Sequence, residues 1–252
     1  RGGEMGPRGG SVKLARDAVE GYARAVGVRA RAAELRDAHD VMTLNTMFRE
    51  EMGQWEQDPA GVWATPSYPE LPLQQIEDII CEEMPGNLIV LVREGGSRQE
   101  RDRAIGYLYS YLEPWGAEGD DVTKRRKPRQ RQQPAKEGSA GASVYIAELF
   151  VLASERGLGL GELLLTESLR LRASSVNRSH LFVSSRNVSA VNCYLKFGFE
   201  RSKTPSGDIN HDLVMELPDA HASIAEAAYR LECRTASRSH TPPAPLPPSS
   251  PS

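Results

Sequence analysis

The chain has 252 residues, of which 39% are hydrophobic and 26% charged, with a formal net charge of −3. Its length allows one large domain or two small ones, and no window approaches the roughly 18 apolar residues of a membrane-spanning helix. The three cysteines, Cys81, Cys193 and Cys233, lie far apart. They form neither a zinc pattern nor a disulfide framework, so we expect reduced thiols in a cytoplasmic or nuclear protein.

The N-terminal half is predicted to form a strand, two helices and two further strands. Residues 1–24 are rich in Gly and Arg and are expected to be a flexible segment. Alternation and apolar periodicity then predict the following elements. They are a strand over 25–32, a long helix over 34–55, a second helix near 73–83, and strands over 87–92 and 104–112.

The C-terminal half begins with a strand at Val144–Val151, which is dense in β-branched and aromatic residues. A glycine turn follows, and apolar spacing after it predicts a helix through Leu171. The remaining expected elements are a strand over 180–184, a helix that starts after Asn187, a strand over 213–217 and a helix over 220–233.

The glycine turn between Arg156 and Gly161 has glycines at 157, 159 and 161. Glycine permits positive φ, so successive backbone N–H groups can converge at the start of a helix, where the dipole adds positive potential. This arrangement favours an anion. The Rossmann and Walker patterns are both absent.

The helix after the next strand carries a second pattern. Asn187 can cap this helix, and Gly198 can end it in a left-handed conformation. Its apolar residues fall on one face at Ala190, Val191, Tyr194 and Leu195.

Together these two patterns resemble the GCN5-related N-acetyltransferases, the GNAT superfamily. The acetyl-CoA motif of that family, Arg/Gln-x-x-Gly-x-Gly/Ala, is matched by Arg156, Gly159 and Gly161. Its following signature is matched by Asn187, Ala190, Tyr194, Gly198 and Phe199. The resemblance implies an α/β fold with a mixed, mostly antiparallel central sheet and flanking helices. The domain would span residues 25–217, followed by a terminal helix and a disordered Pro/Ser-rich tail over 218–252.

The resemblance also implies an activity and a site. The chain would be an acetyl-CoA-dependent N-acetyltransferase that acts on a cationic primary amine of a small molecule or a protein, with no metal. Tyr194 would protonate the departing thiolate, and the cofactor-binding residues would be Leu149, Phe150, Val151, Arg156, Gly157, Leu158, Gly159, Leu160, Gly161 and Asn187. The rival hypothesis is a non-catalytic relative that binds CoA or a protein partner.

The sequence offers several candidates for the general base. One branch of the family places a Glu on the strand before the Asn, where this chain has Phe182. Glu148, on the strand that would hold the thioester, is the best remaining candidate, because a half-buried Glu can have its pKa raised. A water-relayed path without a dedicated base would also serve, and Asp208 and His211 are weaker candidates.

Two regions of the sequence carry charge of mainly one sign. Residues 116–143 are expected to be a disordered insertion with seven basic residues between Lys124 and Lys136. Lys124–Arg131 fits an import receptor, an inert solvated loop fits equally well, and nucleic-acid binding is disfavoured because no aromatic residue interleaves the charges. Nine acidic residues and no basic one lie between Glu50 and Glu83. They would either attract a cationic acceptor or form solvated helix faces.

Overall fold

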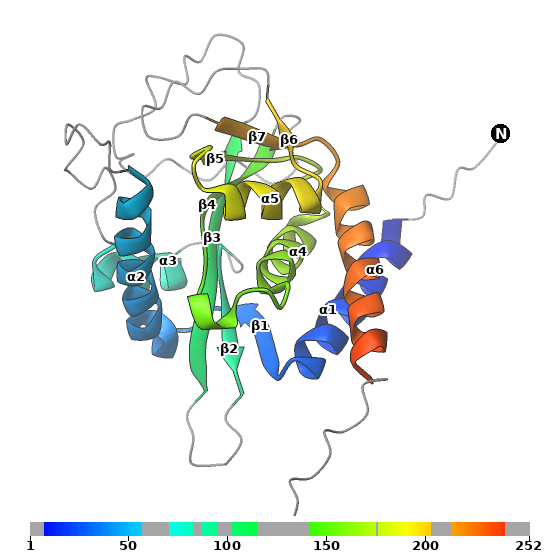
Figure 1. The fold of residues 1–252 in the computed structure, drawn as a ribbon, viewed down its shortest axis with the longest axis horizontal. Coiled ribbons are helices and arrows are strands. Elements are labelled where there is room, and N and C mark those ends of the chain that lie inside the picture. The colour runs from blue at the N-terminus through cyan, green and yellow to red at the C-terminus, as the bar shows by residue number, and fades with distance from the viewer. Residues whose placement is uncertain are drawn as a thin grey trace, which may run out of the picture.

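The computed structural model describes residues 8–56, 71–82, 87–94, 102–114, 142–174, 176–202 and 213–239. In this part of the chain the centre of the fold is one seven-stranded sheet with strand order β1-β2-β3-β4-β5-β7-β6 (Figure 1). The strands are β1 (Val28–Ala32), β2 (Leu88–Arg93), β3 (Arg103–Pro114), β4 (Ala142–Val151), β5 (Ser179–Val183), β6 (Glu200–Arg201) and β7 (Leu213–Leu217). Neighbouring strands run antiparallel except β4 and β5, which are parallel.

Helices cover both faces of this sheet. They are α1 (Arg8–Ala25), α2 (Ala38–Glu56), α3 (Leu73–Glu82), α4 (Leu160–Arg172), α5 (Val188–Phe197) and α6 (Ala220–Ser239), with short 3-10 turns at η1 (Leu35–Asp37) and η3 (Ala153–Glu155). Helices α2 and α3 pack over one face, and α1, α4, α5 and α6 pack over the other (Figure 1). This mixed, mostly antiparallel sheet with flanking helices confirms the predicted fold class.

The N-terminal segment differs from its prediction. Residues 8–25 form helix α1, where we expected a flexible segment over 1–24. Ala15, Ala18, Val19 and Tyr22 recur at helical spacing and are all buried against the core on the α4 side. The high Gly and Arg content of this segment concealed the stripe, because Ala contributes little to a hydrophobic pattern.

The other predicted elements are present, with ends that differ by a few residues. The largest difference is the terminal helix, predicted to end at 233, since α6 continues to Ser239. Most of the predicted insertion over 116–143 lies outside the described residues, and its last two residues belong to β4. The predicted tail from residue 240 and the weaker base candidates at 208 and 211 also lie outside. Among the described residues, no helix is both long and apolar enough to cross a membrane.

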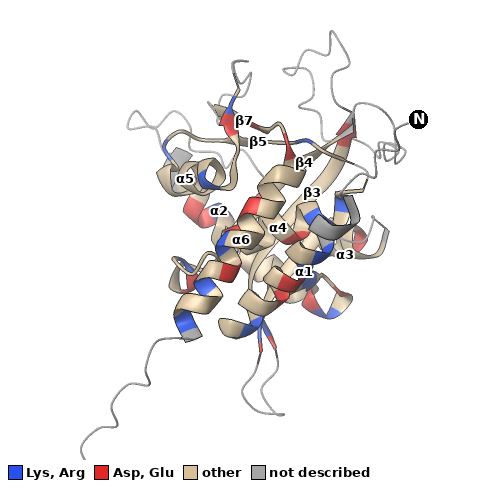
Figure 2. Ribbon diagram, turned by 90° about the vertical axis from the view of Figure 1, so that its right-hand side faces the viewer, with Lys and Arg blue, Asp and Glu red and all other residues tan. Residues whose placement is uncertain are grey.

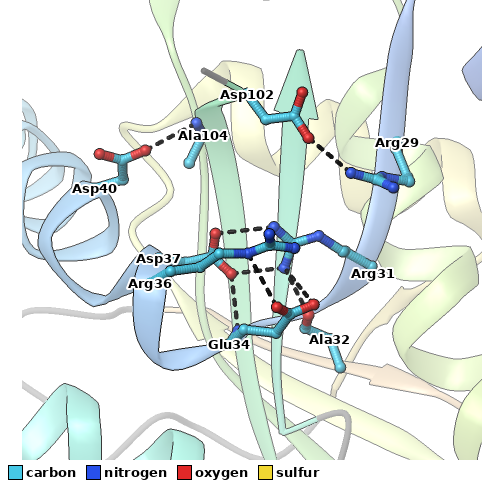
Figure 3. A network of polar contacts seen from close by, with 9 residues as sticks. All are labelled: Arg29, Arg31, Ala32, Glu34, Arg36, Asp37, Asp40, Asp102 and Ala104. Carbon is cyan, nitrogen blue, oxygen red and sulfur yellow. Dashed lines mark hydrogen bonds and ion pairs between the residues drawn. The ribbon is translucent and has the colours of Figure 1, made fainter. Parts of the chain in front are cut away.

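A polar network fixes the junction of β1 with α2 (Figure 3). The Arg31 guanidinium donates to both carboxylate oxygens of Asp37, at 2.6 and 2.9 Å. Burial alone would raise the pKa of Asp37, but hydrogen bonds from Arg31 and from the backbone N–H of Glu34 hold it below its usual value. Arg29 pairs with Asp102 at 2.7 Å, which ties β1 to the chain just before β3. This junction sets where α2 crosses the sheet.

A bulge in β4 opens the sheet at its centre. Tyr109 of β3 pairs with Glu148, but the next residue, Ser110, pairs with Ile146, so Ala147 is an extra residue on β4. Beyond this point β4 leaves β5. The parallel ladder runs only from Val144 to Ile146 on β4, although β4 itself continues to Val151.

Candidate active site

The carboxyl ends of β4 and β5 form the centre of the candidate site. The two strands are paired up to Ile146 and Leu181, and beyond this point β3 is the one partner strand of β4 among the described residues. Helix α4 begins shortly after β4, and α5 begins shortly after β5 (Figure 1). In sheets with parallel strands, ligands bind outside the carboxyl ends where the strand connections diverge. The predicted site residues on β4, in the glycine turn and on α5 therefore belong to segments that follow the point where the pairing of β4 with β5 ends.

The glycine turn has the backbone conformation that the sequence predicts. Gly157 and Gly159 have φ values of +81° and +75°, in the left-handed region that L side chains rarely adopt. Gly159 is the residue before α4, and its carbonyl accepts the N–H of Leu163, so the helix is established from its first turn. The preceding N–H groups are thus gathered at a helix N-terminus, a geometry that suits a phosphate.

Two side chains hold this turn in place. Tyr22 of α1 donates its hydroxyl hydrogen to the carbonyl of Leu158. Arg156 donates from Nε to the carbonyl of Val151 at 2.9 Å, and its two Nη atoms donate to the carboxylate of Glu51 at 2.8 and 2.6 Å. Arg156 therefore ties the turn to β4 and α2, a contact that sequence spacing does not reveal.

Gly161 has a packing role of its own. A Cβ at this position would lie 3.2 Å from Cys193 Sγ, so the absence of a side chain lets α4 approach α5 closely. Cys193 is largely withdrawn from solvent, and burial, with the nearby charge of Glu162, raises the pKa of its thiol to about 11. The thiol stays protonated at neutral pH and packs as an apolar group.

Asn187 caps α5, as the sequence predicts. Its Oδ1 accepts the backbone N–H of Ala190 at 3.1 Å, and Gly198 ends the same helix with a φ of +113°. The cap thus supplies an acceptor to one of the N–H groups in the first turn of α5.

We expect Asn187→Ala to lower the free energy of unfolding by about 1 kcal/mol, because one helix N–H loses its acceptor. Asn187→Asp keeps an equally good cap and adds a negative charge. Chemical denaturation measures the first effect and titration with acetyl-CoA the second. If Asn187 also orients the cofactor, Asp preserves stability and weakens binding. If Asp preserves both, the residue is only a cap.

Tyr194 lies inside the α5 side of the core and is 8% exposed. Its ring packs edge-on against Phe199, with 5.7 Å between centroids. Burial raises the pKa of Tyr194, with a smaller contribution from Cys193. The phenol is therefore neutral across the physiological range and keeps the hydrogen that a proton donor needs.

Glu148 is also buried, at 8% exposure, but it is not isolated. One carboxylate oxygen accepts from Asn45 Nδ2 at 2.9 Å and from the Tyr107 hydroxyl at 2.8 Å. The other accepts from Arg49 of α2, with which Glu148 forms an ion pair. The sequence suggested the half-buried Glu but not these three donors, which come from segments far away in the chain.

Aromatic side chains that the sequence reasoning missed extend from Glu148 along the same face of the sheet. Tyr145 stacks tilted against His180 at 5.2 Å and edge-on against Phe182 at 5.9 Å between centroids. His180 Nδ1 lies 3.0 Å from the Ser143 hydroxyl. Strand alternation could have found this group, because 143 and 145, and 180 and 182, are alternate positions on the two strands.

The acidic stretch between Glu50 and Glu83 is only partly available to attract an acceptor. Glu51 is neutralised by its two hydrogen bonds with Arg156. Asp78 accepts from Gln74 on the exposed side of α3. The attraction of a cationic acceptor by this acidic stretch thus stays a prediction. At least one of its residues, Glu51, is already paired with Arg156.

Residues 45–199 of this chain, more than half of it, match the sequence model of the Acetyltransferase (GNAT) family. The chain therefore belongs to the GNAT acetyltransferases, a family of acetyl-CoA-dependent N-acetyltransferases. No curated protein sequence matches it closely enough to count as a relative.

Two solved structures agree with this fold, and a third shows a weaker similarity that does not bear on it. The loading GNATL domain of CurA from Lyngbya majuscula superposes with a TM-score of 0.51 at 15% identity, over 77% of this chain and 98% of that one. A GNAT-family acetyltransferase from Streptococcus agalactiae 2603 gives a TM-score of 0.50 at 13% identity, over 76% and 95%. Arabidopsis thaliana Naa50, solved with a bisubstrate analogue, gives 0.46 at 20% identity, over 75% and 97%.

Proposed function

We propose that this chain transfers the acetyl group of acetyl-CoA to the primary amine of a cationic acceptor, a small molecule or a protein. The observation that carries the proposal is the separation of β4 from β5 at the bulge, with the glycine turn and the cap of α5 at its edge. The opening offers an unpaired strand edge beside two helix N-termini. An elongated thioester that ends in phosphates suits such a site.

Each part of the opening has a role in this proposal. Backbone groups of Leu149, Phe150 and Val151 align the pantetheine arm, because this edge of β4 has no strand partner among the described residues. The N–H groups from Gly157 through Leu158, Gly159 and Leu160 to Gly161 hold the pyrophosphate. Arg156 fixes the turn, and Asn187 holds α5 in position.

The chemistry needs one bond formed and one broken. The acceptor ammonium first loses a proton to a base or to water. The neutral amine nitrogen then attacks the thioester carbonyl, a C–N bond forms, and the C–S bond breaks to release the thiolate of CoA. The nitrogen loses its second proton to the base or to water, and Tyr194 supplies a proton or a hydrogen bond to the sulfur. Acetyl-CoA provides the activated acyl group, and the protein provides its alignment.

Glu148 remains the candidate base, but its carboxylate already accepts hydrogen bonds from three side chains. Its carboxylate holds Asn45, Tyr107 and Arg49, so accepting a proton from the acceptor requires at least one of these donors to move. A water relay, without direct transfer to Glu148, avoids that rearrangement.

Binding of acetyl-CoA followed by acetyl transfer tests the proposal. Titration calorimetry with acetyl-CoA should show binding, and a thiol-release assay over polyamines, amino sugars, lysine peptides and N-terminal peptides should show one preferred amine class. Binding without release of CoA for every amine class would contradict acetyl transfer to amines.

The glycine turn offers a specific variant for the same titration. Gly159→Asp should weaken acetyl-CoA binding at least tenfold, or about 1.4 kcal/mol, because a negative charge enters the phosphate position. Gly159→Ala is the matched control, since it bears the same strain at positive φ and the same contact with Arg234 but no charge. A folded Gly159→Asp protein with unchanged affinity would show that no phosphate sits on this turn.

A further inference from the structure

Helix α6 lies outside the region that defines the family, yet its C-terminal end reaches the glycine turn. The family match ends at residue 199, and α6 spans Ala220–Ser239. It packs along α1 and α4 on the same side of the sheet (Figure 1). Tyr22, Gly157 and Leu158 line one side of a hollow of about 410 Å³ at this place. The other side belongs to α6, through Cys233, Arg234, Ser237 and Arg238.

The residues along the packed face of α6 change from apolar to basic where the helix reaches this hollow. Ile224, Ala227 and Leu231 are buried in the core. Seven residues after Ala227 stands Arg234, and seven after Leu231 stands Arg238, so both arginines continue the same face of the helix. Figure 2 shows basic residues gathered at this end of α6. The helix thus turns an apolar packing face into a cationic one beside the glycine turn.

Arg234 touches the turn itself. Its Nη1 atom lies within contact distance of the position that a Cβ at Gly159 would take, so the guanidinium rests against that residue. A side chain at position 159 would be strained by the positive φ and would have to displace the end of Arg234. The same Nη1 donates to Glu162, in the first turn of α4, at 2.7 Å.

Not every arginine of this cluster has an ion-pair partner within the described part of the chain. Glu162, 6% exposed, accepts from both Arg230 and Arg234, and Arg230 also pairs with Glu226. Glu162 and Glu226 thus pair with Arg230 and Arg234, and Arg238 has no ion-pair partner among the described residues. The guanidinium of Arg238, which also lines the hollow, is therefore available to a bound anion.

We propose that Arg234 and Arg238 of α6 form an anion subsite for a phosphate of the CoA nucleotide. The inference rests on the proposed function, because it requires CoA at the glycine turn. Arginine presents paired N–H donors that match phosphate oxygens, and such charge-assisted hydrogen bonds are the strong ones. The C-terminal helix thereby becomes part of the cofactor site, next to the N–H groups of the turn.

Titration calorimetry with CoA and with 3′-dephospho-CoA tests this subsite. Arg238 is exposed and near the end of α6, so Arg238→Gln should fold normally, and we expect it to weaken CoA binding about tenfold. Arg238→Lys should recover much of the loss by keeping the charge. Arg16→Gln, on the exposed side of neighbouring α1, removes the same charge away from the hollow and should change nothing.

The two ligands identify which phosphate is bound. If the loss in Arg238→Gln disappears with 3′-dephospho-CoA, the subsite holds the 3′-phosphate. If the loss is the same for both ligands, the subsite holds the pyrophosphate. Wild-type affinity in both Arg238→Gln and Arg234→Gln overturns the inference, and so does an equal loss in Arg16→Gln, which would indicate net charge alone. A wild-type protein that binds no acetyl-CoA overturns the proposed function together with it.

Discussion

Glu148→Gln is expected to lower the free energy of unfolding by about 3 to 5 kcal/mol, the usual cost of removing one member of a buried ion pair. The side chains of Arg49 and Glu148 are only 11% and 9% exposed, so the guanidinium would stay largely out of water without this carboxylate. Asn45 and Tyr107 would also lose a charged acceptor. Urea denaturation followed by circular dichroism measures the change.

A double variant separates stability from catalysis at the same position. Glu148→Gln combined with Arg49→Met removes both charges, and replacing a buried pair by uncharged groups is often neutral. We therefore expect the double variant to recover most of the lost stability. If the double variant is no more stable than Glu148→Gln alone, the ion pair does not account for the loss.

The folded double variant then decides the role of Glu148 in the reaction. A base must lose its proton before it can work, so the rate falls on the acidic limb of the pH–rate profile as the base becomes protonated. If Glu148 is that base, the double variant turns over slowly and this limb is lost or displaced. If Glu148 only anchors α2 to β4, turnover and the pH profile stay close to wild type. The second result would favour a water relay.

Tyr194→Phe is expected to reduce turnover on the order of 100-fold while leaving acetyl-CoA affinity nearly unchanged. The departing thiolate has the basicity of an ordinary thiol, with a pKa of about 8.5, so it gains only moderately from one positioned acid. Burial raises the pKa of Tyr194, so the phenol holds its hydrogen throughout the working pH range. Phe retains the ring and its packing against Phe199.

Single-turnover kinetics with a saturating amine measure this effect on the chemical step. Tyr229→Phe is a matched control, because it removes the same hydroxyl from a ring that is 67% exposed on α6. Thermal unfolding should show both variants close to wild type. Full turnover in Tyr194→Phe, with chemistry limiting the rate, would remove Tyr194 from the mechanism and leave the cofactor site standing.

Local sequence was sufficient for the parts of the site that are made of backbone. Of the three glycines in the turn, Gly157 and Gly159 adopt positive φ, whereas Gly161 lies within α4. Asn187 was expected to cap α5 and Gly198 to end it, and both do. These features depend on a few consecutive residues whose conformational preferences are intrinsic, so their spacing in the sequence carries the information.

The contacts of the side chains were decided only by the tertiary structure. Arg156 reaches Glu51, which lies 105 positions earlier, and Glu148 meets Arg49 from 99 positions away. Strand alternation places Glu148 on a face of the sheet but does not say which helix crosses above it. That crossing depends on the β1–α2 junction and on the bulge in β4, which moves one residue of the strand out of register.

The first and last helices, α1 and α6, show most clearly which features local sequence predicts and which only the tertiary structure decides. The apolar spacing of α6 was visible in the sequence, although its last turn and a half were not, and the stripe of α1 was hidden by small residues. What no local pattern contains is that both helices pack beside α4 and bring Tyr22 and Arg234 to the glycine turn. The sequence by itself thus determined the family, the glycine turn and the cap of α5. Long-range packing alone decided which charged groups surround them, because the burial of each helix depends on surfaces contributed by distant parts of the chain.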